Sequence, residues 1–463
     1  MSTQRQTTIG EHAVVLGASM AGLLAARVLA DAFTRVTVIE RDALQDTADP
    51  RQGVPQGRHA HGLLVAGTRV VDELFPGLLE TFEPDGVTTL HEPDELSFAP
   101  GGHKLCSDGP YERPTPSYQP SRPYLEWRIR TALLERANVE LVDRCKLVNL
   151  ERDGDCVTGA TVQRAGAEEE RLSADLVVDA TGRTGRTAKW LAAMGYAAPP
   201  EERLEVDIRY VSRHLRLRPG ALGREKVIIV GAEPGRPTGT FFAAEDDHHI
   251  LTLIGYKGFH PPTDPDAFLR FAEGVLPDSA MAAVRDAEWL DDPVAHRYRA
   301  SVRRRYDRVK RLPTGLIVIG DALCSFNPAY GQGMSTAALQ AIALRDCLAA
   351  GPRKLERRYF KTAIKRTDIA WQLAVGGDLA LPEVEGPRPL PARLANAYIG
   401  RVLRAAEDDW AVAERFMQVC WLVAPPTVLF RPSTVRRVLR ANRRRRRAPV
   451  PAVRRLDAAE ETR

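Results

Sequence analysis

The stretch from His12 to Asp42 constrains the fold of this chain more than any other. It begins with an apolar segment, Ala13 to Leu16, which runs into the glycine turn GASMAG at residues 17–22. A helical pattern follows, and a second apolar segment, Val36 to Ile39, ends at Glu40. Strand, glycine turn, helix and strand in this order are typical of the opening unit of a dinucleotide-binding fold.

The residue types in this stretch suit a bound pyrophosphate. Gly17 lets the backbone turn sharply, Ser19 is small enough for close phosphate approach, and Gly22 lets the helix pack close to its strand. The helix N-terminus presents free N–H groups and a positive dipole end to the phosphates. Glu40 follows the first glycine by 23 residues, close to the spacing of about 20 at which an acid binds the ribose hydroxyls.

A second glycine landmark lies between residues 312 and 350. An apolar strand, Leu316 to Ile319, leads to Asp321 and then to a loop that contains Pro328, Gly331 and Gly333. A long apolar helix starts near Gly333, and its first N–H groups can hold an electron-rich carbonyl or an anionic ring. Asp321 can accept a hydrogen bond from a polyol hydroxyl.

The segments between these landmarks predict two sheets. The buried strand 176–178, which also ends in a glycine turn, suits a further parallel strand of the first sheet. From 203 to 256 the hydrophobic period changes to two, which predicts antiparallel strands of a second, inserted sheet. Helices are expected at 121–137, 264–276 and 278–287. A sheet that faces a cofactor domain is a natural wall for a substrate pocket.

Two irregular stretches are candidates for the rim of that pocket. Residues 51–67 are rich in glycine, proline and basic residues, and Arg58 within them could hold a phosphate or a flavin edge. His59 and His61 form an HxH pair without acids or cysteines nearby, which does not favour a metal site. Residues 84–123 are dense in proline and glycine, and are either a surface excursion or a lid over the pocket.

Bulk properties indicate a cytoplasmic protein without a membrane span. The 463 residues contain no 18-residue apolar run, and the N-terminus lacks the apolar core of a signal peptide. The six cysteines form no CxxC pair, so free thiols are expected.

The positive charge of the chain is concentrated at its C-terminus. From residue 431 onward there are twelve arginines against three acids, which leaves the first 430 residues at −4 although the whole chain carries +5. An acidic body argues against nucleic-acid binding. For the basic end we favour a packed helix followed by a disordered tail, and the alternative is weak contact with an anionic lipid surface.

Taken together, these motifs resemble those of the FAD-dependent monooxygenases related to para-hydroxybenzoate hydroxylase. GASMAG with Glu40 is similar to the family's first FAD motif, and GDALCSFNPAYGQGMS to its second, in which the aspartate holds the ribityl chain and the proline–glycine loop faces the flavin ring. Arg122 matches an arginine of the family that contacts the cofactor. The wording GVPQGRHAHGLL and DLVVDATGR is similar to natural-product tailoring enzymes, including polyether polyene epoxidases.

The resemblance implies that NAD(P)H reduces FAD, that O2 then gives a flavin hydroperoxide, and that this species epoxidises or hydroxylates an apolar alkene-bearing or aromatic natural product. An alkene epoxidation needs no side-chain nucleophile or base, so we name no catalytic residue. The chain departs from the family at the Asp-Gly motif tied to nicotinamide use, whose place is taken by residues 179–183. The WxWxIP motif of flavin halogenases is absent from the sequence. Alternative hypotheses are an FAD-dependent reductase of prenyl double bonds and a flavoprotein with an idle FAD.

The sequence therefore predicts an α/β protein: a Rossmann-like FAD-binding domain, an inserted antiparallel substrate-binding sheet and a C-terminal helical region. The expected parts are FAD-binding segments at 1–83, 121–200 and 301–350, a lid region at 84–120, a substrate sheet at 201–300, helices at 351–440 and a disordered basic tail at 441–463. The predicted cofactor-binding residues are Gly17, Ser19, Met20, Ala21, Gly22, Glu40, Arg41, Arg58, Arg122, Asp321, Pro328, Gly331, Gln332, Gly333 and Met334. FAD, NAD(P)H, O2 and a small apolar organic substrate are the expected ligands, and no metal is expected.

Overall fold

The first sheet is wholly parallel and is built around the strand that precedes the glycine turn. The computed structural model describes residues 8–447 except 52 and 114. The strand order is β17-β10-β1-β2-β6. The bounds are β1 Gly10–Leu16, β2 Phe33–Ile39, β6 Val139–Val142, β10 Leu176–Asp179 and β17 Leu316–Val318. The central strands are buried because helices and a smaller sheet cover them, as parallel sheets require.

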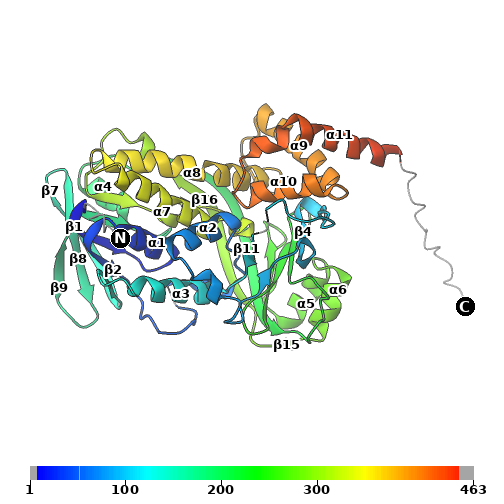
Figure 1. The fold of residues 1–463 in the computed structure, drawn as a ribbon, viewed down its shortest axis with the longest axis horizontal. Coiled ribbons are helices and arrows are strands. Elements are labelled where there is room, and N and C mark those ends of the chain that lie inside the picture. The colour runs from blue at the N-terminus through cyan, green and yellow to red at the C-terminus, as the bar shows by residue number, and fades with distance from the viewer. Residues whose placement is uncertain (1–7, 52, 114, 448–463) are drawn as a thin grey trace, which may run out of the picture.

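Helices from distant parts of the sequence pack against one another beside this sheet (Figure 1). The helix after the glycine turn, α1 (Met20–Ala30), contacts α7 (Gly333–Ala349), and α7 contacts α8 (Leu355–Asp378). The others nearby are α2 Val65–Leu74, α3 Arg122–Leu134 and α4 Thr187–Ala193. Ser121 caps α3 as its sequence predicts, since its hydroxyl accepts the N–H of Tyr124. The two glycine landmarks thus belong to one hydrophobic core.

A small antiparallel sheet forms the end of the molecule farthest from the C-terminal helices (Figure 1). It has the order β7-β8-β9, with bounds β7 Cys145–Asp153, β8 Cys156–Arg164 and β9 Glu169–Ser173. Apolar residues at 145–151 and 156–163 predict strands where β7 and β8 lie, but not their separation from the parallel sheet. Asp153 and Gly154 form the turn between β7 and β8, as their residue types indicate.

The second sheet has the order β18-β16-β11-β14-β13-β12-β4, with β15 beside β11. Its bounds are β4 Leu96–Ala99, β11 Glu201–Arg216, β12 Val227–Val230, β13 Thr238–Ala243, β14 His248–Gly255, β15 Glu288–Trp289, β16 Val294–Arg304 and β18 Cys324–Ser325. Its pairs are antiparallel, as predicted, except that β4 pairs with β12 in parallel. Helices α5 Pro265–Glu273 and α6 Asp278–Arg285 pack on one face around Phe268.

The supposed lid region therefore contributes to this sheet. β4 lies within 84–120, and two shorter strands, β3 Thr89–Leu90 and β5 Ser117–Tyr118, pair with each other. Strand β16 also crosses the predicted domain boundary at 300. Sequence periodicity could not place β4, because a four-residue strand flanked by prolines and glycines carries too short a pattern.

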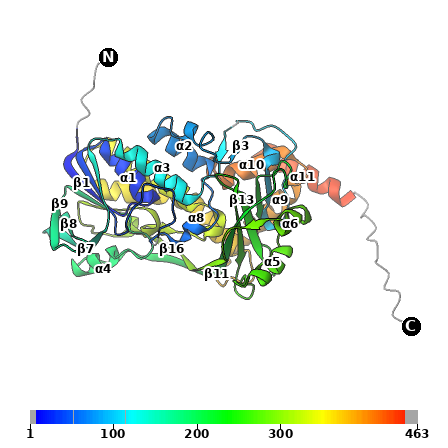
Figure 2. The same cartoon turned by 90° about the horizontal axis from the view of Figure 1, so that it is seen from below.

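Three further helices pack together at the opposite end of the molecule, as Figure 2 shows from below. They are α9 Leu390–Ala406, α10 Trp410–Cys420 and α11 Pro432–Arg447, with a core of their own that includes Leu105. The predicted tail boundary at 441 is wrong for the described residues, because α11 continues to Arg447. The rest of that prediction, 448–463, lies outside the described residues.

Two bulk predictions can be compared with the structure. All six cysteines lie in the described part of the chain and none forms a disulfide, as expected. Among the helices of residues 8–447, apart from 52 and 114, none is both long and apolar enough to cross a bilayer.

Candidate functional site

A single cavity of about 1250 Å³ runs between the parallel sheet, the second sheet and the C-terminal helices. The glycine turn at 17–22 and the loop at 327–334 both line it, although they are three hundred residues apart in sequence. The central requirement of the sequence hypothesis, that these two turns face one space, is confirmed. Pockets for drug-sized ligands span about 300–1,000 Å³, so this cavity has room for a dinucleotide and a second molecule.

The backbone of the glycine turn packs closely against its neighbours, as is expected of a phosphate-binding turn. Gly17 has φ +106°, and a Cβ added there would lie 2.7 Å from the carbonyl oxygen of Ala180. A Cβ at Gly22 would lie 1.8 Å from the carbonyl oxygen of Gly17. No side chain caps the N-terminus of α1, so its first N–H groups are available to a ligand in the cavity.

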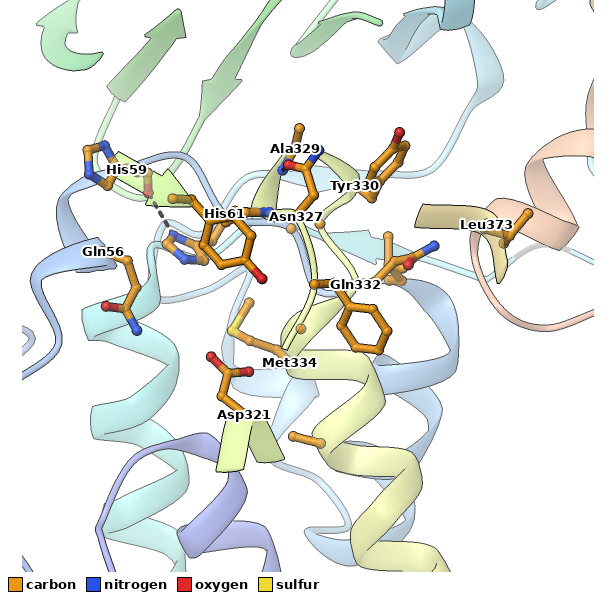
Figure 3. Close-up of a pocket in the computed structure, with 18 of the residues that line it drawn as sticks. Gln56, His59, His61, Asp321, Asn327, Ala329, Tyr330, Gln332, Met334 and Leu373 are labelled. Carbon is orange, nitrogen blue, oxygen red and sulfur yellow. Dashed lines mark hydrogen bonds between the residues drawn. The ribbon is translucent and has the colours of Figure 1, made fainter. Parts of the chain in front are cut away.

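The second glycine landmark packs against the first glycine turn at Gly320. Gly320, at the end of β17, has φ +69°, and a Cβ there would lie 2.6 Å from the Cβ of Ala21. The carboxylate of the next residue, Asp321, points into the cavity (Figure 3). It has no hydrogen bond or ion pair to the described residues, and burial raises its pKa. A carboxylate placed in this way is ready to accept hydrogen bonds from a polyol.

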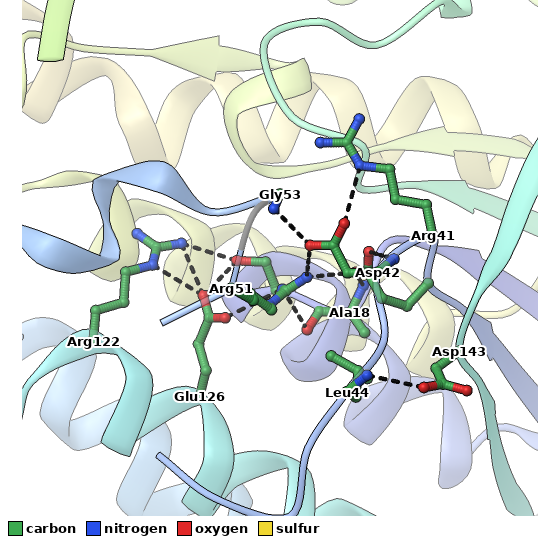
Figure 4. A network of polar contacts seen from close by, with 11 residues as sticks. Ala18, Arg41, Asp42, Leu44, Arg51, Gly53, Arg122, Glu126 and Asp143 are labelled. Atoms are coloured by element: carbon green, nitrogen blue, oxygen red, sulfur yellow. Dashed lines mark hydrogen bonds and ion pairs between the residues drawn. The ribbon is translucent and has the colours of Figure 1, made fainter. Parts of the chain in front are cut away.

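The acid at the end of β2 belongs to a dense ion-pair network, in which Figure 4 labels Arg51, Asp42 and Glu126. Glu40 accepts a hydrogen bond from the N–H of Ala18 at 2.8 Å and pairs with Arg51 at 3.0 Å. Arg51 also pairs with Glu126 at 3.2 Å and with Asp42 at 3.3 Å. Although burial acts against ionisation, the charges of Arg122 and Arg51 lower the pKa of Glu126. The network fixes the loop after β2 against α3.

Arg122 joins this network on the side of the glycine turn. Its guanidinium donates to the hydroxyl of Ser19 at 2.9 Å and to Glu126 at 3.0 Å. Ser19 in turn donates to Glu126 at 2.6 Å. The sequence singled out Arg122 and Ser19 but missed Arg51 and Glu126. Glu126 could have been found from its i,i+4 spacing to Arg122, which places both on one face of a helix.

Most of the predicted cofactor residues line the cavity. Those that do are Gly17, Ser19, Met20, Ala21, Glu40, Arg41, Arg122, Asp321, Pro328, Gly331, Gln332, Gly333 and Met334. Gly22 lies behind the turn and acts through helix packing. The structure does not bring Arg58 to the cavity: its side chain is exposed, and its carbonyl oxygen accepts a hydrogen bond from His214.

The glycine-rich loop around Arg58 instead turns Gln56, His59 and His61 toward the cavity. The Nδ1 atom of His59 is 2.7 Å from the hydroxyl of Ser212 on β11, and its Nε2 atom is buried without a partner among the described residues. Burial, with the nearby His61, lowers the pKa of His59 to about 3. Burial also lowers the pKa of His61 to about 4. Both imidazoles are therefore neutral at physiological pH.

Residues 179–183, which take the place of the family's Asp-Gly motif, combine one buried aspartate with residues that line the cavity. Asp179 is fully buried and accepts hydrogen bonds from the N–H of Thr181 at 2.9 Å and from the hydroxyl of Thr187. Residues 180–186 line the cavity, and the guanidinium of Arg183 lies 4.9 Å from the ring centre of Tyr298. Arg183 thus brings a cation close to the second sheet.

The buried carboxylate of Asp378, which is not among the predicted site residues, holds the loop at 327–334 in place. One oxygen of Asp378, at the end of α8, accepts hydrogen bonds from the amide of Asn327 at 2.7 Å and from the hydroxyls of Tyr256 and Tyr330 at 3.0 Å each. Burial raises the pKa of Asp378 to about 6. No local pattern in the sequence indicates this contact, because Asp378 lies 51 residues beyond Asn327 at the far end of a long helix.

The far half of the cavity is mainly apolar, although Thr238, Thr240 and Thr252 of the second sheet and Asn396 of α9 also line it. The second sheet contributes Ile229, Phe242 and Ile254, and the former lid region contributes Leu96 and Phe98. The C-terminal region lines this half with Ile399, Leu403, Phe416, Trp421, Leu429 and Phe430. The region that the sequence left as either a surface excursion or a rim is thus partly a wall of the cavity.

The residues present fit FAD. The uncapped helix end suits the pyrophosphate, Glu40 suits the ribose, Asp321 suits the ribityl chain, and the loop at 328–334 suits the ring edge. No group of His, Cys, Asp and Glu side chains suited to a metal ion is found among the described residues.

The chain is similar in sequence and in fold to several known proteins. A family model described as an FAD binding domain matches residues 11–374. "Protein Rv3254" of Mycobacterium tuberculosis is 37% identical over 422 residues, which are 88% of this chain and 89% of that protein. A "Kynurenine 3-monooxygenase" of Salinispora tropica is 29% identical over 430 residues, 86% of each chain. The structure of the flavin-dependent brominase Bmp2 has the same fold, with a TM-score of 0.65 at 16% identity, covering 94% of this chain and 100% of that one.

Proposed function

The chain belongs to the family of proteins with an FAD binding domain, and on that premise we propose that it is a flavin-dependent monooxygenase of an apolar small molecule. The observation that carries the proposal is the shared cavity. Two FAD-type turns line one half of it, and aromatic and aliphatic side chains line the other. The relative named as a kynurenine 3-monooxygenase supports oxygen transfer as the reaction class.

Bound FAD, reduced by NAD(P)H, would supply activated oxygen, so that one atom of O2 enters the substrate and the other leaves as water. The chain itself binds and orients the cofactor and the substrate, and it excludes water from the reacting atoms. Asp321 and Glu40 would hold the two sugar-like parts of the cofactor, and the loop at 328–334 would hold the edge of its ring. Asp378 keeps that loop in position through Asn327 and Tyr330.

The substrate would occupy the apolar half, between Phe242 on the second sheet and Ile399 on α9. The aromatic and aliphatic side chains that dominate this wall favour an apolar substrate over water. An alkene carbon placed in this half can be epoxidised without help from a side-chain base. We accordingly assign the side chains to positioning.

The test is oxygen incorporation. The FAD-loaded protein is incubated with NADH or NADPH and ¹⁸O2 in the presence of apolar polyenes, indole and, as a polar comparator, kynurenine. The expected result is a product of an apolar compound that carries one ¹⁸O atom, with matching oxidation of the nicotinamide. Product formation without O2 would identify a reductase instead. FAD binding with no substrate-dependent nicotinamide oxidation across the panel would contradict the proposal.

A further inference from the structure

Exposed apolar side chains gather on the C-terminal helices. Seven large hydrophobic side chains of the described residues are exposed, and four of them lie between 390 and 439. Leu390 and Leu394, one turn apart at the start of α9, are 64% and 62% exposed, and Phe430 is 50% exposed. Phe430 stacks on Tyr398 at 4.8 Å between ring centres, which places it one turn along α9 from Leu394. The three side chains therefore form one apolar ridge.

The adjoining helix presents arginines without acids. Residues 432–447 of α11 contain no Asp or Glu. Arg437 pairs with Asp409 at 3.1 Å, and Arg445 pairs with Asp408 at 2.5 Å. Four more arginines are exposed and form no ion pair with the described residues; they are Arg436, Arg440, Arg443 and Arg444. These four line one shallow depression together with Leu439, which is 43% exposed.

The apolar ridge stands at an opening of the cavity. Ala395 and Phe430 both line the cavity and are both exposed to solvent. The apolar half of the cavity therefore reaches the surface between the start of α9 and the start of α11. In Figure 1 these helices lie at the end of the molecule farthest from the β7–β9 sheet. A compound can enter here without crossing the cofactor half.

We propose that this face, made of Leu390, Leu394, Phe430 and Leu439 with Arg436, Arg440, Arg443 and Arg444, docks on an anionic lipid surface and holds the cavity opening against it. Arginines attract anionic headgroups, and the exposed leucines and the phenylalanine enter the boundary between headgroups and acyl chains. An apolar compound dissolved in the lipid then reaches the cavity without passing through water. A nucleic acid would satisfy the arginines but would leave the apolar ridge exposed.

The proposal goes beyond oxygen transfer, and its test is independent of turnover. The full-length protein, loaded with FAD, is sedimented with vesicles of phosphatidylcholine alone and of phosphatidylcholine with 30% phosphatidylglycerol, at 50 mM and 500 mM NaCl. We expect binding to the anionic vesicles at 50 mM NaCl and release at 500 mM NaCl. Binding to neither vesicle, or equal binding to both, would overturn the proposal, whatever the oxygen-transfer assay shows.

Two sets of variants test the arginines and the apolar ridge of this face separately. Changing the four unpaired arginines to Gln removes four charges and should lower the vesicle partition coefficient roughly 100-fold or more, since each basic residue near an anionic surface contributes several-fold. The matched control changes Arg144, Arg152, Arg164 and Arg171 to Gln at the opposite end of the molecule, where all four are exposed. This control removes the same charge and should bind as the parent does. Equal losses in both variants would show that only net charge matters and would refute the docking face.

The apolar ridge distinguishes lipid from nucleic acid. Leu390→Ser with Leu394→Ser should weaken vesicle binding about tenfold or more and leave binding to a duplex DNA oligonucleotide unchanged. Both positions are more than 60% exposed, so the changes leave the helix core intact. Unaltered vesicle binding in this variant, or tighter binding of the parent to DNA than to vesicles at 50 mM NaCl, would reject lipid as the partner.

Discussion

The close packing of α1 against the turn before it makes Gly22→Ala the sharpest test of the cofactor site. A Cβ at residue 22 would lie 1.8 Å from the carbonyl oxygen of Gly17, whereas ordinary contacts begin at 3.4 Å. The helix and the turn must therefore separate by about 1.6 Å. Overpacking of this kind typically costs about 1–3 kcal/mol. The shift displaces the peptide groups that face the phosphates, so we expect the FAD dissociation constant to rise about 5- to 150-fold.

The assay is an equilibrium titration of the apoprotein with FAD, followed by flavin fluorescence. The matched control is Gly400→Ala in α9, where an added Cβ meets nothing within 4 Å and the residue lines the apolar half of the cavity, away from the glycine turn. Alanine in a helix interior is favoured over glycine by about 0.5–1 kcal/mol, so the control should be slightly more stable and bind FAD as the parent does. An unchanged FAD affinity in Gly22→Ala would refute the assignment of this turn to the cofactor, and an equal loss in both variants would refute the role of close packing.

Three other variants probe buried charges. Asp321→Asn should weaken FAD binding about 10- to 150-fold in the same titration, because a hydrogen bond to a charged group contributes about 1.5–3 kcal/mol, and an unchanged affinity would remove Asp321 from the site. Arg51→Met leaves Glu40, Asp42 and Glu126 without their common partner, so the free energy of unfolding in urea should fall by about 3–5 kcal/mol; the exposed Arg171→Met is its control. The pKa of Asp378 is raised from 3.8 to about 6 in the folded protein, because the fold favours the protonated carboxyl. The stabilisation that this protonation provides is fully present below about pH 3.8 and is lost as the pH rises through 6. The parent should therefore gain about 1.4 kcal/mol over Asp378→Asn between pH 7.5 and pH 5, and parallel pH profiles of urea unfolding would contradict this.

The sequence by itself determined the parts whose chemistry is local. A short run of residues is enough to predict a glycine with positive φ, a helix that starts without a side-chain cap, or an acid at the end of a strand. The turn at 17–22, Glu40, Asp321 and the loop at 328–334 were found in this way, and they line the cavity where the sequence predicts them. The parallel and antiparallel sheets followed from hydrophobic period, because that period is set by neighbours along one strand.

Only the tertiary structure decided which distant side chains meet. Arg51 contacts Glu126 across 75 residues, and Asp378 holds Asn327 across 51. Neither pair leaves a pattern in sequence, because the separation is set by how the helices pack and not by any local repeat. Arg58 was misplaced for the same reason: composition marks its loop as functional, but the packing of that loop on β11 decides that His59 faces inward and Arg58 outward. Local chemistry is encoded residue by residue, whereas the orientation of a side chain toward a shared cavity depends on all the elements that enclose it.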